Sequence, residues 1–366
     1  MKIGIVTLTG TSNYGAALQI HALQKVIEQS GAECETLSYN NPYVINDHVP
    51  EGLFKKKGLK KKLIAILAYN AYKKRLEKFK AFENKYCRLS KKEYYPDNIN
   101  EANNKYDRFV TGSDQVWNNK ITHGDTNYFL DFVSNEKKKF SYAASSGTDG
   151  IDDEKNISML ENFDLISVRE MRLEDFLKTG FSDEKASLVR TDVDPTFLLD
   201  SSYWKKFVSE RPREKDYIFL YLFGANPSNI DFIRKLKKKY NCDVIALSKF
   251  NTGRYGFKYV YDLSPEEFLN YIYHAKFVVT GSFHAFCFSV QFEKDVYITS
   301  SPIPERSARL INLAETLGMT DRILGKSPEE KAQLNYEPIK EKVKKYRDIS
   351  METISLICSE SVRGGI

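Results

Sequence analysis

Short apolar runs alternate with helical patterns along the first forty residues. Residues 2–8 form an apolar run typical of a buried strand, and residues 34–39 form a second one. Between them, residues 16–29 have the spacing of a helix that is closed by Gly31. This order of strand, helix and strand predicts a β-α-β unit and therefore a parallel sheet.

The alternation continues through the chain in two series. The first series has further strands at 106–111, 139–144, 164–168 and 187–193, with a helix at 169–178. The second begins after the charged stretch 210–216 and has strands at 217–223, 243–247, 277–280 and 296–298, with helices at 229–240, 265–274 and from about residue 284. We therefore predict two doubly wound, Rossmann-like α/β domains at residues 1–212 and 213–335, with a helical tail at 336–366 that packs back on the first domain.

Residues 50–92 form a strongly basic helical insertion in the first predicted domain. Apolar residues recur at helical spacing at positions 59, 63, 66, 67 and 71, and basic residues occupy positions 55–57, 60–62, 73–75, 78, 80, 85, 88, 91 and 92. The pattern indicates either a solvated charged face or attraction to an anionic membrane surface or an acidic substrate. No recognised nucleic-acid module accompanies the charge, so we predict no nucleic-acid partner.

Composition limits the class of protein further. The chain has 366 residues, and 42% of them are hydrophobic, which is enough for two buried cores. Its net charge is +6. The opening apolar run is too short for a signal peptide, and no later run reaches the roughly 18 apolar residues of a membrane span. We expect a cytoplasmic protein that reaches the inner face of the membrane if the basic helix binds there. The five cysteines are scattered without a C-x-x-C pair, so neither a disulfide framework nor a metal site is expected.

The first loop that joins a strand to a helix is a candidate anion site. Ser12, Asn13, Tyr14 and Gly15 lie at the carboxyl end of a predicted strand and just before a helix, where backbone amides attract anions. The Lys-Ser/Thr pair of a P-loop is absent, which argues against ATP or GTP. A tight turn with a serine or asparagine cap is the alternative.

A second loop, residues 111–118, offers polar groups beside an indole. Ser113, Gln115 and Trp117 suit a carbohydrate acceptor, since an indole can lie against the apolar face of a sugar. Asp114 is a candidate for orienting or deprotonating an acceptor hydroxyl, and the alternative for it is a helix cap.

Arg169 stands where a predicted strand gives way to a helix. Its guanidinium can grip a carboxylate or phosphate with two hydrogen bonds, and the alternative is a salt bridge with a helix glutamate such as Glu174. The Asp-Pro-Thr sequence at residues 194–196 reads as a turn that proline fixes and aspartate caps.

The second domain repeats the arrangement of strand, Gly-Ser turn and helix. Gly281 and Ser282 end a strand, and His284 follows at the start of a helix, a position suited to proton transfer. Arg306 and Arg309 follow the last predicted strand and either add positive charge to the same site or face solvent.

Taken together, the motifs resemble those of the polysaccharide pyruvyl transferase family. They are Asn13-Tyr14-Gly15, the Gly-Ser-Asp-Gln-Val-Trp sequence at 112–117, Ser-Val-Arg-Glu at 167–170, Asp-Pro-Thr at 194–196 and Gly-Ser-Phe-His at 281–284, within residues 1–320. The resemblance implies a GT-B-like fold that binds phosphoenolpyruvate. We expect the first domain to form the acceptor side and the second domain the donor side, with the first loop, Ser12, Asn13, Tyr14 and Gly15, also binding the donor together with Gly281 and Ser282. It also implies that Arg169 matches a family arginine near the donor and His284 the catalytic histidine. Many members have arginine at the position of Ser282, so here Arg306 or Arg309 would supply the missing charge.

The implied reaction transfers pyruvate from phosphoenolpyruvate to a sugar of a surface polysaccharide or its lipid-linked precursor, as in capsule or exopolysaccharide biosynthesis. His284 would protonate the enol carbon, Asp114 would handle the acceptor hydroxyl, and a second hydroxyl would close a cyclic ketal as phosphate leaves. No step requires a metal or redox cofactor. A glycosyltransferase that uses a nucleotide sugar is the main alternative, because the same architecture hosts that chemistry, and a carbohydrate-binding protein without catalysis is another.

Overall fold

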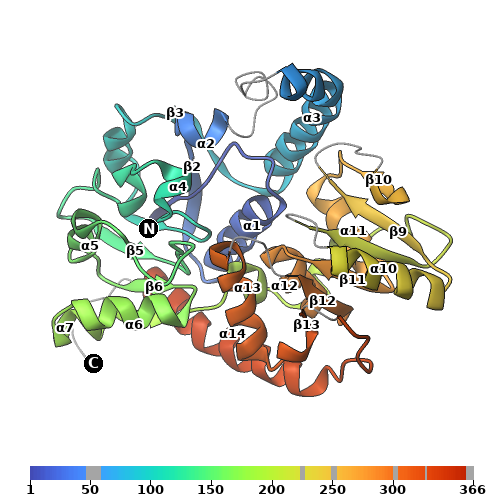
Figure 1. The fold of residues 1–366 in the computed structure, drawn as a ribbon. Helices are drawn as coiled ribbons and strands as arrows, with labels where there is room; N and C mark the ends of the chain where they lie inside the picture. The colour runs from blue at the N-terminus through green and yellow to red at the C-terminus, as the bar shows by residue number, and fades with distance from the viewer. Residues whose placement is uncertain (47–58, 223–226, 249–253, 300–303, 326–327, 360–366) are drawn as a thin grey trace. The chain divides into compact units, whose positions relative to one another are not determined.

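The chain divides into two compact units. The computed structural model describes residues 1–46, 59–222, 227–248, 254–299, 304–325 and 328–359, apart from the side chains of residues 46, 59–68 and 304–306 (Figure 1). Unit 1 comprises residues 1–48, 83–199 and 344–366, and unit 2 comprises residues 49–82 and 200–343. Each unit is built around its own parallel sheet.

Among the described residues of unit 1 there are seven parallel strands. They are β1 (Lys2–Val6), β2 (Glu33–Tyr39), β3 (Leu89–Tyr94), β4 (Arg108–Thr111), β5 (Lys138–Ser141), β6 (Ile166–Val168) and β7 (Val189–Thr191). The first five form a sheet in the order β3-β2-β1-β4-β5, and β6 pairs with β7. Parallel bridges from Phe140 to Leu165 and from Ala144 to Val168 connect β5 to β6, so the strand order continues from one sheet into the other.

The helices of unit 1 include a largely buried one, α1. They are α1 (Tyr14–Gln29), α2 (Pro42–Asn46), α4 (Asn119–Thr122), α5 (Glu154–Leu160), α6 (Met171–Gly180), α7 (Asp183–Ala186) and α8 (Pro195–Leu198), with 3-10 turns at Ile99–Asn104 and Thr126–Phe129. Helix α1 packs against β2 and α8, and its buried residues extend around most of its circumference.

The C-terminal helix α14 (Glu337–Cys358) begins in unit 2 and ends in unit 1. Within unit 1, the Thr353 hydroxyl donates to Asp192 at 2.8 Å, and Arg108 donates to the carbonyl oxygen of Ile357 at 2.8 Å. These contacts fasten the tail to β4 and to the residue that follows β7.

Six parallel strands form the sheet of unit 2. They are β8 (Tyr217–Tyr221), β9 (Asp243–Leu247), β10 (Lys258–Val260), β11 (Phe277–Thr280), β12 (Asp295–Thr299) and β13 (Ile323–Leu324), in the order β10-β9-β8-β11-β12-β13. The helices are α3 (Leu59–Tyr86), α9 (Ser201–Trp204), α10 (Pro227–Lys239), α11 (Pro265–His274), α12 (Phe283–Gln291) and α13 (Pro304–Leu317), with 3-10 turns at Lys205–Phe207, Arg254–Gly256 and Thr320–Arg322.

Strand β8 shows why unit 2 has helices on both faces of its sheet. Ile218 and Leu220 belong to a core cluster with the apolar residues of α10. The intervening residue Phe219 packs instead against Phe268 and Tyr271 of α11, with ring centroids 6.1 and 5.9 Å away. Because successive side chains of a strand point to opposite faces, a continuously apolar strand is covered on both sides. The expected doubly wound architecture is thus present.

The division into units differs from the sequence prediction in two respects. The chain passes into unit 2 at Asp200 instead of near residue 212, and residues 49–82 group with unit 2 instead of forming an insertion in the first domain. The reason lies in α3: Lys74 and Lys78 form ion pairs with Asp262 and Glu267 of unit 2, at 2.8 and 2.6 Å.

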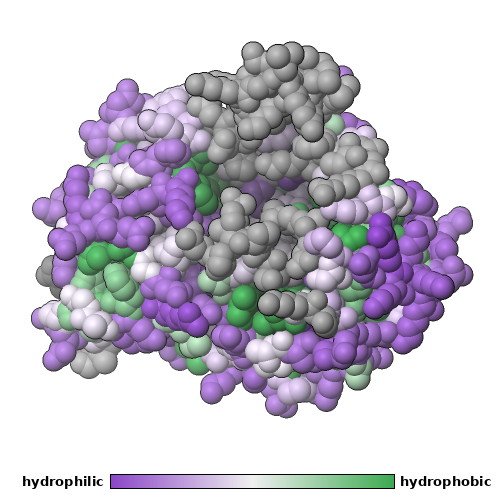
Figure 2. Space-filling model, viewed as in Figure 1, coloured by the Kyte–Doolittle hydropathy of each residue, from purple (hydrophilic) through white to green (hydrophobic). Residues whose placement is uncertain are grey.

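No helix among the described residues is long and apolar enough to cross a membrane. On the face shown in Figure 2, hydrophilic residues dominate the coloured surface, and the hydrophobic residues form separate patches.

Candidate functional site

The order of the strands identifies one candidate edge in each sheet. The direction of strand succession reverses between β1 and β4 in unit 1 and between β8 and β11 in unit 2. In open α/β sheets, ligands bind at the carboxyl ends of the strands at such a reversal. The loops that follow β4 and β11 carry the Gly-Ser motifs found in the sequence.

In unit 1 the loop after β4 turns inward. The Ser113 hydroxyl donates to the carbonyl oxygen of Ala143 at 2.7 Å, and the Ser113 carbonyl accepts from the Thr7 hydroxyl at 3.0 Å. The Gln19 side chain accepts from the Ser113 amide at 3.2 Å. Every polar group of Ser113 therefore has a partner inside the protein, and its side chain is buried. This differs from the predicted contact with an acceptor sugar.

Asp114 continues that turn in a left-handed conformation, with φ of 72°. Aspartate adopts this region more readily than most residues because its short side chain can bond locally. The carbonyl oxygen of Asp114 accepts from the amides of Val116 and Ser145 at 2.9 and 3.0 Å. The backbone thereby directs the buried Asp114 carboxylate to a fixed place beside the end of β6, where Arg169 lies.

Arg169 is the centre of a buried ionic cluster. Its side chain is 2% exposed, and its nitrogens lie 2.9 Å from Asp194, 3.3 Å from Glu170 and 3.7 Å from Asp114. Burial alone would lower the pKa of Arg169, but these three carboxylates outweigh it and raise the pKa. The sequence predicted a guanidinium directed at an anionic donor, whereas the structure encloses it among carboxylates of its own unit. Glu174, the partner considered in the alternative, pairs with Lys178.

The carboxylates around Arg169 are themselves held by other groups. The Ser145 hydroxyl donates to Glu170 at 2.9 Å, and the Thr196 hydroxyl and amide donate to Asp194 at 2.7 and 3.1 Å. Asp194 thus caps the turn at residues 194–196, as predicted, and also binds Arg169. Sequence reasoning did not assign Ser145 or Glu170 to the site. The signals for Glu170 were its place next to Arg169 at the end of a strand and its membership of the Ser-Val-Arg-Glu motif at 167–170.

Trp117 and Gln115 complete the loop after β4 in different environments. The Trp117 indole is 2% exposed, stacks on Phe129 at 5.5 Å and donates to the carbonyl oxygen of Tyr128 at 3.1 Å. It therefore lies in the core instead of offering a face to a sugar. Gln115 is half-buried, and its side chain accepts from Asn118 at 2.7 Å.

The first loop ends in a helix cap. Asn13 is the N-cap of α1, and its side-chain oxygen accepts from the Gly15 amide at 3.0 Å. This is the asparagine cap that the sequence analysis left open as an alternative to an anion site. Ser12 and Tyr14 on either side are buried.

In unit 2 the loop after β11 leads directly into a helix. The Thr280 hydroxyl accepts from the Ser282 amide at 2.9 Å, and Ser282 caps α12 by accepting from the Ala285 amide at 3.4 Å. His284 therefore sits in the first turn of α12, where the end of the helix carries a partial positive charge. The Phe283 ring lies edge-on to the imidazole, with centroids 5.2 Å apart.

Arg309 lies close to this loop. Its guanidinium carbon is 5.6 Å from the centroid of the Phe283 ring, so α13 brings a cation to the residue that precedes His284. The side chain of Arg306 lies outside the described residues. Unit 2 thus brings together Gly281, Ser282, His284 and Arg309, whereas unit 1 brings together Ser113, Asp114 and Arg169.

The predicted basic face of α3 is only partly open to solvent. Besides the ion pairs of Lys74 and Lys78, Arg75 is buried and lies over the Phe79 ring at 5.5 Å. The lysines at residues 55–57, and the side chains of those at 60–62, lie outside the described residues. The described part of α3 therefore uses several of its cations within unit 2.

Comparison with known proteins places this chain in a family and a fold class. A sequence model described as "Polysaccharide pyruvyl transferase" matches residues 13–301. No curated protein matches the sequence significantly. Among solved structures, a putative UDP-N-acetylglucosamine 2-epimerase from Listeria monocytogenes is similar at 11% identity and a TM-score of 0.53, over 97% of this chain and 91% of that one. Another UDP-N-acetylglucosamine 2-epimerase is similar at 12% identity and a TM-score of 0.50, over 100% and 98% of the two chains. The predicted GT-B-like fold class is confirmed.

Proposed function

The chain belongs to the polysaccharide pyruvyl transferase family, and we propose that it transfers pyruvate from phosphoenolpyruvate to a sugar of a surface polysaccharide or of its lipid-linked precursor. The observation that carries the proposal is the family match over residues 13–301, which contains the loops after β4, β6, β7 and β11 and begins at Asn13, the last residue of the loop after β1. In each unit these loops follow the carboxyl ends of the strands, where ligands bind in open α/β sheets.

The proposed chemistry needs a proton donor near the enol carbon of phosphoenolpyruvate. We assign this role to His284 in its protonated form, because it stands at the switch point of the sheet of unit 2. Protonation of the CH2 carbon makes the neighbouring carbon electrophilic, and one sugar hydroxyl adds there and loses its proton. Phosphate leaves with cleavage of its C–O bond, and a second hydroxyl adds to close the ketal.

Phosphoenolpyruvate also needs cations for its carboxylate and phosphate groups. Arg309 is the proposed donor cation, because it lies against Phe283, beside His284. Arg169 is already surrounded by three carboxylates of unit 1, so an additional anion there would meet more negative than positive charge. We therefore assign Arg169 a positioning role: it holds Asp114 and Glu170, and Asp114 would orient the acceptor hydroxyl.

The proposal is tested by incubating the protein with phosphoenolpyruvate and a panel of lipid-linked and nucleotide sugars. We expect release of phosphate and a mass increase of the acceptor that corresponds to a pyruvate ketal. Release of a nucleotide from a nucleotide sugar, without consumption of phosphoenolpyruvate, would instead identify a glycosyltransferase. Acceptor binding without any turnover would identify a carbohydrate-binding protein.

Two variants test the residues. His284→Gln should lower kcat by about 10²–10⁴-fold, because the amide cannot donate a proton as an acid. His123→Asn in unit 1 serves as the control and should keep full activity.

Arg309→Ala should raise the KM for phosphoenolpyruvate, and the control Arg234→Ala removes an exposed arginine of α10. Unchanged kinetics of the first variant of each pair would remove that residue from the proposed site.

A further inference from the structure

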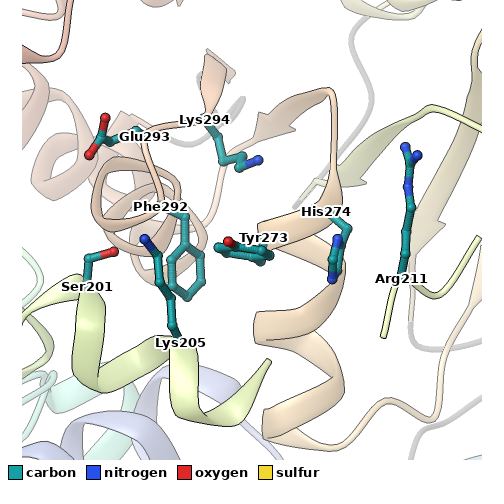
Figure 3. Close-up of a pocket in the computed structure, with 8 residues that line it drawn as sticks. All are labelled: Ser201, Lys205, Arg211, Tyr273, His274, Phe292, Glu293 and Lys294. Carbon is teal, nitrogen blue, oxygen red and sulfur yellow. The ribbon is translucent and has the colours of Figure 1, made fainter. Parts of the chain in front are cut away.

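A polar pocket lies in unit 2, away from the loop that carries His284. Its volume is about 480 Å³. Tyr273 and His274, which line it, precede β11, while Glu293 and Lys294 precede β12 (Figure 3). The pocket is therefore at the amino ends of the parallel strands, whereas His284 follows the carboxyl end of β11. Four residues of strand, at about 3.3 Å each, separate the two ends of β11 by roughly 13 Å.

Three cations line this pocket, and two of them lie near one aromatic ring. The ammonium groups of Lys205 and Lys294 lie 6.0 and 5.4 Å from the centroid of the Tyr273 ring, and Arg211 provides a third positive group at the edge of the pocket. Arg211 is paired with Asp216 at 2.5 Å. Within the described part of the chain, neither Lys205 nor Lys294 forms an ion pair with a carboxylate. The two lysines thus share a ring but lack a protein counterion among the described residues.

The surroundings of Lys294 are unfavourable for its charge. Burial lowers the pKa of Lys294, and the positive charges of Arg211 and Lys205 lower it further. The ammonium group of Lys294 donates to the carbonyl oxygen of Ala275 over a long distance, 3.4 Å. Repulsion between like charges raises the free energy of the protein without ligand. An anion that binds between these charges compensates the repulsion.

The acidic residue next to Lys294 does not supply that anion. In Figure 3 the Glu293 side chain points away from Tyr273, whereas the Lys294 side chain extends toward Tyr273. The carboxylate of Glu293 lies instead 4.0 Å from the ammonium group of Lys340. The negative charge nearest in sequence is therefore directed away from the two lysines.

We propose that this pocket binds a ligand that carries a phosphate group, with Lys205 and Lys294 as its charge partners. A phosphate dianion matches two ammonium groups, and the guanidinium of Arg211 can contribute from the edge. The volume of about 480 Å³ is typical of pockets that hold a small organic molecule and exceeds what phosphate alone would fill. The phosphate can belong to a soluble metabolite or to a phospholipid headgroup. The site lies apart from the proposed donor site and does not depend on the proposed activity.

The test compares two double variants of the full chain that lose equal charge. Lys205→Met/Lys294→Met removes the two lysines of the pocket, and Lys235→Met/Lys238→Met removes two exposed lysines of α10. Methionine keeps the length and the apolar stem of lysine. Binding of pyrophosphate is measured by calorimetry and by thermal unfolding in phosphate-free buffer. At ten times the Kd we expect Tm to rise by roughly 2–4 °C in the wild type and in the α10 variant.

The pocket variant should bind pyrophosphate at least tenfold more weakly than the α10 variant, and equal affinities in the two would overturn the proposal. If the double variant does not fold, the single variant Lys205→Met at an exposed position should bind pyrophosphate at least threefold more weakly than the wild type. An unchanged Kd of this single variant would also overturn the proposal. A second arm uses phosphatidylcholine vesicles with and without phosphatidylglycerol. If the wild type binds the anionic vesicles and the pocket variant does not, the ligand is a phospholipid headgroup. If the wild type binds only pyrophosphate, the ligand is a soluble molecule. If it binds neither, the site is refuted.

Discussion

Two Thr-Gly-Ser turns lie at equivalent places in the two sheets. The first is followed by a turn and the second by a helix. Residues 111–113 follow β4, and residues 280–282 follow β11; each of these strands lies across the switch point from the first strand of its sheet. In both turns the threonine hydroxyl donates to a backbone carbonyl, at 2.8 Å to Tyr128 and at 2.9 Å to Tyr221. The start of the two loops is therefore alike.

The residue after each serine separates the two turns. Asp114 takes a left-handed conformation that ends the turn without a helix, and Ser113 becomes an internal hydrogen-bonding residue. Phe283 instead begins α12, so Ser282 becomes a helix cap and His284 takes a place in the first turn. The same tripeptide at the same edge thus forms part of a buried polar scaffold in unit 1, and in unit 2 it caps a helix whose first turn carries His284, which is also buried. We expect substitutions in the first turn to affect stability and those in the second to affect activity.

The largest effect on stability is expected for Arg169→Met, which leaves the carboxylates of Asp114, Glu170 and Asp194 buried without their cation. Removal of one partner of a buried ionic group costs about 3–5 kcal/mol of the free energy of unfolding. Urea denaturation measures it. As a control, Arg172→Met removes an exposed arginine of α6 and should cost less than about 1 kcal/mol. A loss below about 1 kcal/mol for Arg169→Met would show that the cluster does not hold the first turn.

Gly112→Ala should be next in size. Gly112 has φ of 108°, and a Cβ there would lie 2.5 Å from the carbonyl oxygen of Tyr142, so both the backbone and the packing oppose alanine. We expect a loss of about 2–4 kcal/mol. Gly124→Ala is the matched control, because Gly124 has φ of 75° but no atom within 4 Å of its Cβ position. It should cost about 1 kcal/mol, and equal losses in the two variants would contradict a steric role for Tyr142.

Most of the fold could be predicted from the pattern of apolar residues. The helix α11 and the strands β9 and β11 have the predicted bounds. Each has a clear apolar or amphipathic pattern that is flanked by residues that interrupt it. Strands β10 and β13 are only three and two residues long and carry too little pattern to be recognised. Strand β3 was missed because charged residues occupy its middle, where three positions in succession are exposed.

The candidate site was less predictable, because its contacts join distant segments. The place of Arg169 at the end of a strand was evident, but its partners Asp114 and Asp194 come from other loops, and only the packed sheet brings them within 3.7 Å. The polar neighbours of Trp117 suggested an exposed indole, whereas its ring fills the core beside Phe129. Local sequence therefore identifies which residues stand at the functional edge, and the packed structure decides which partners each of them has.

The smallest effects are expected for the two serines. Ser113→Ala removes a buried hydrogen bond of 2.7 Å to Ala143 and should cost about 1–2 kcal/mol, because that carbonyl loses its donor in the interior. Ser282→Ala removes a cap whose hydrogen bond is 3.4 Å long and should cost about 0.5–1 kcal/mol, at the low end for caps. Pyruvyl transfer should respond in the opposite order, since only Ser282 sets the first turn of the helix that carries His284. Denaturation and steady-state kinetics on both variants measure this, and a greater loss of activity in Ser113→Ala would move the catalytic role from the second turn to the first.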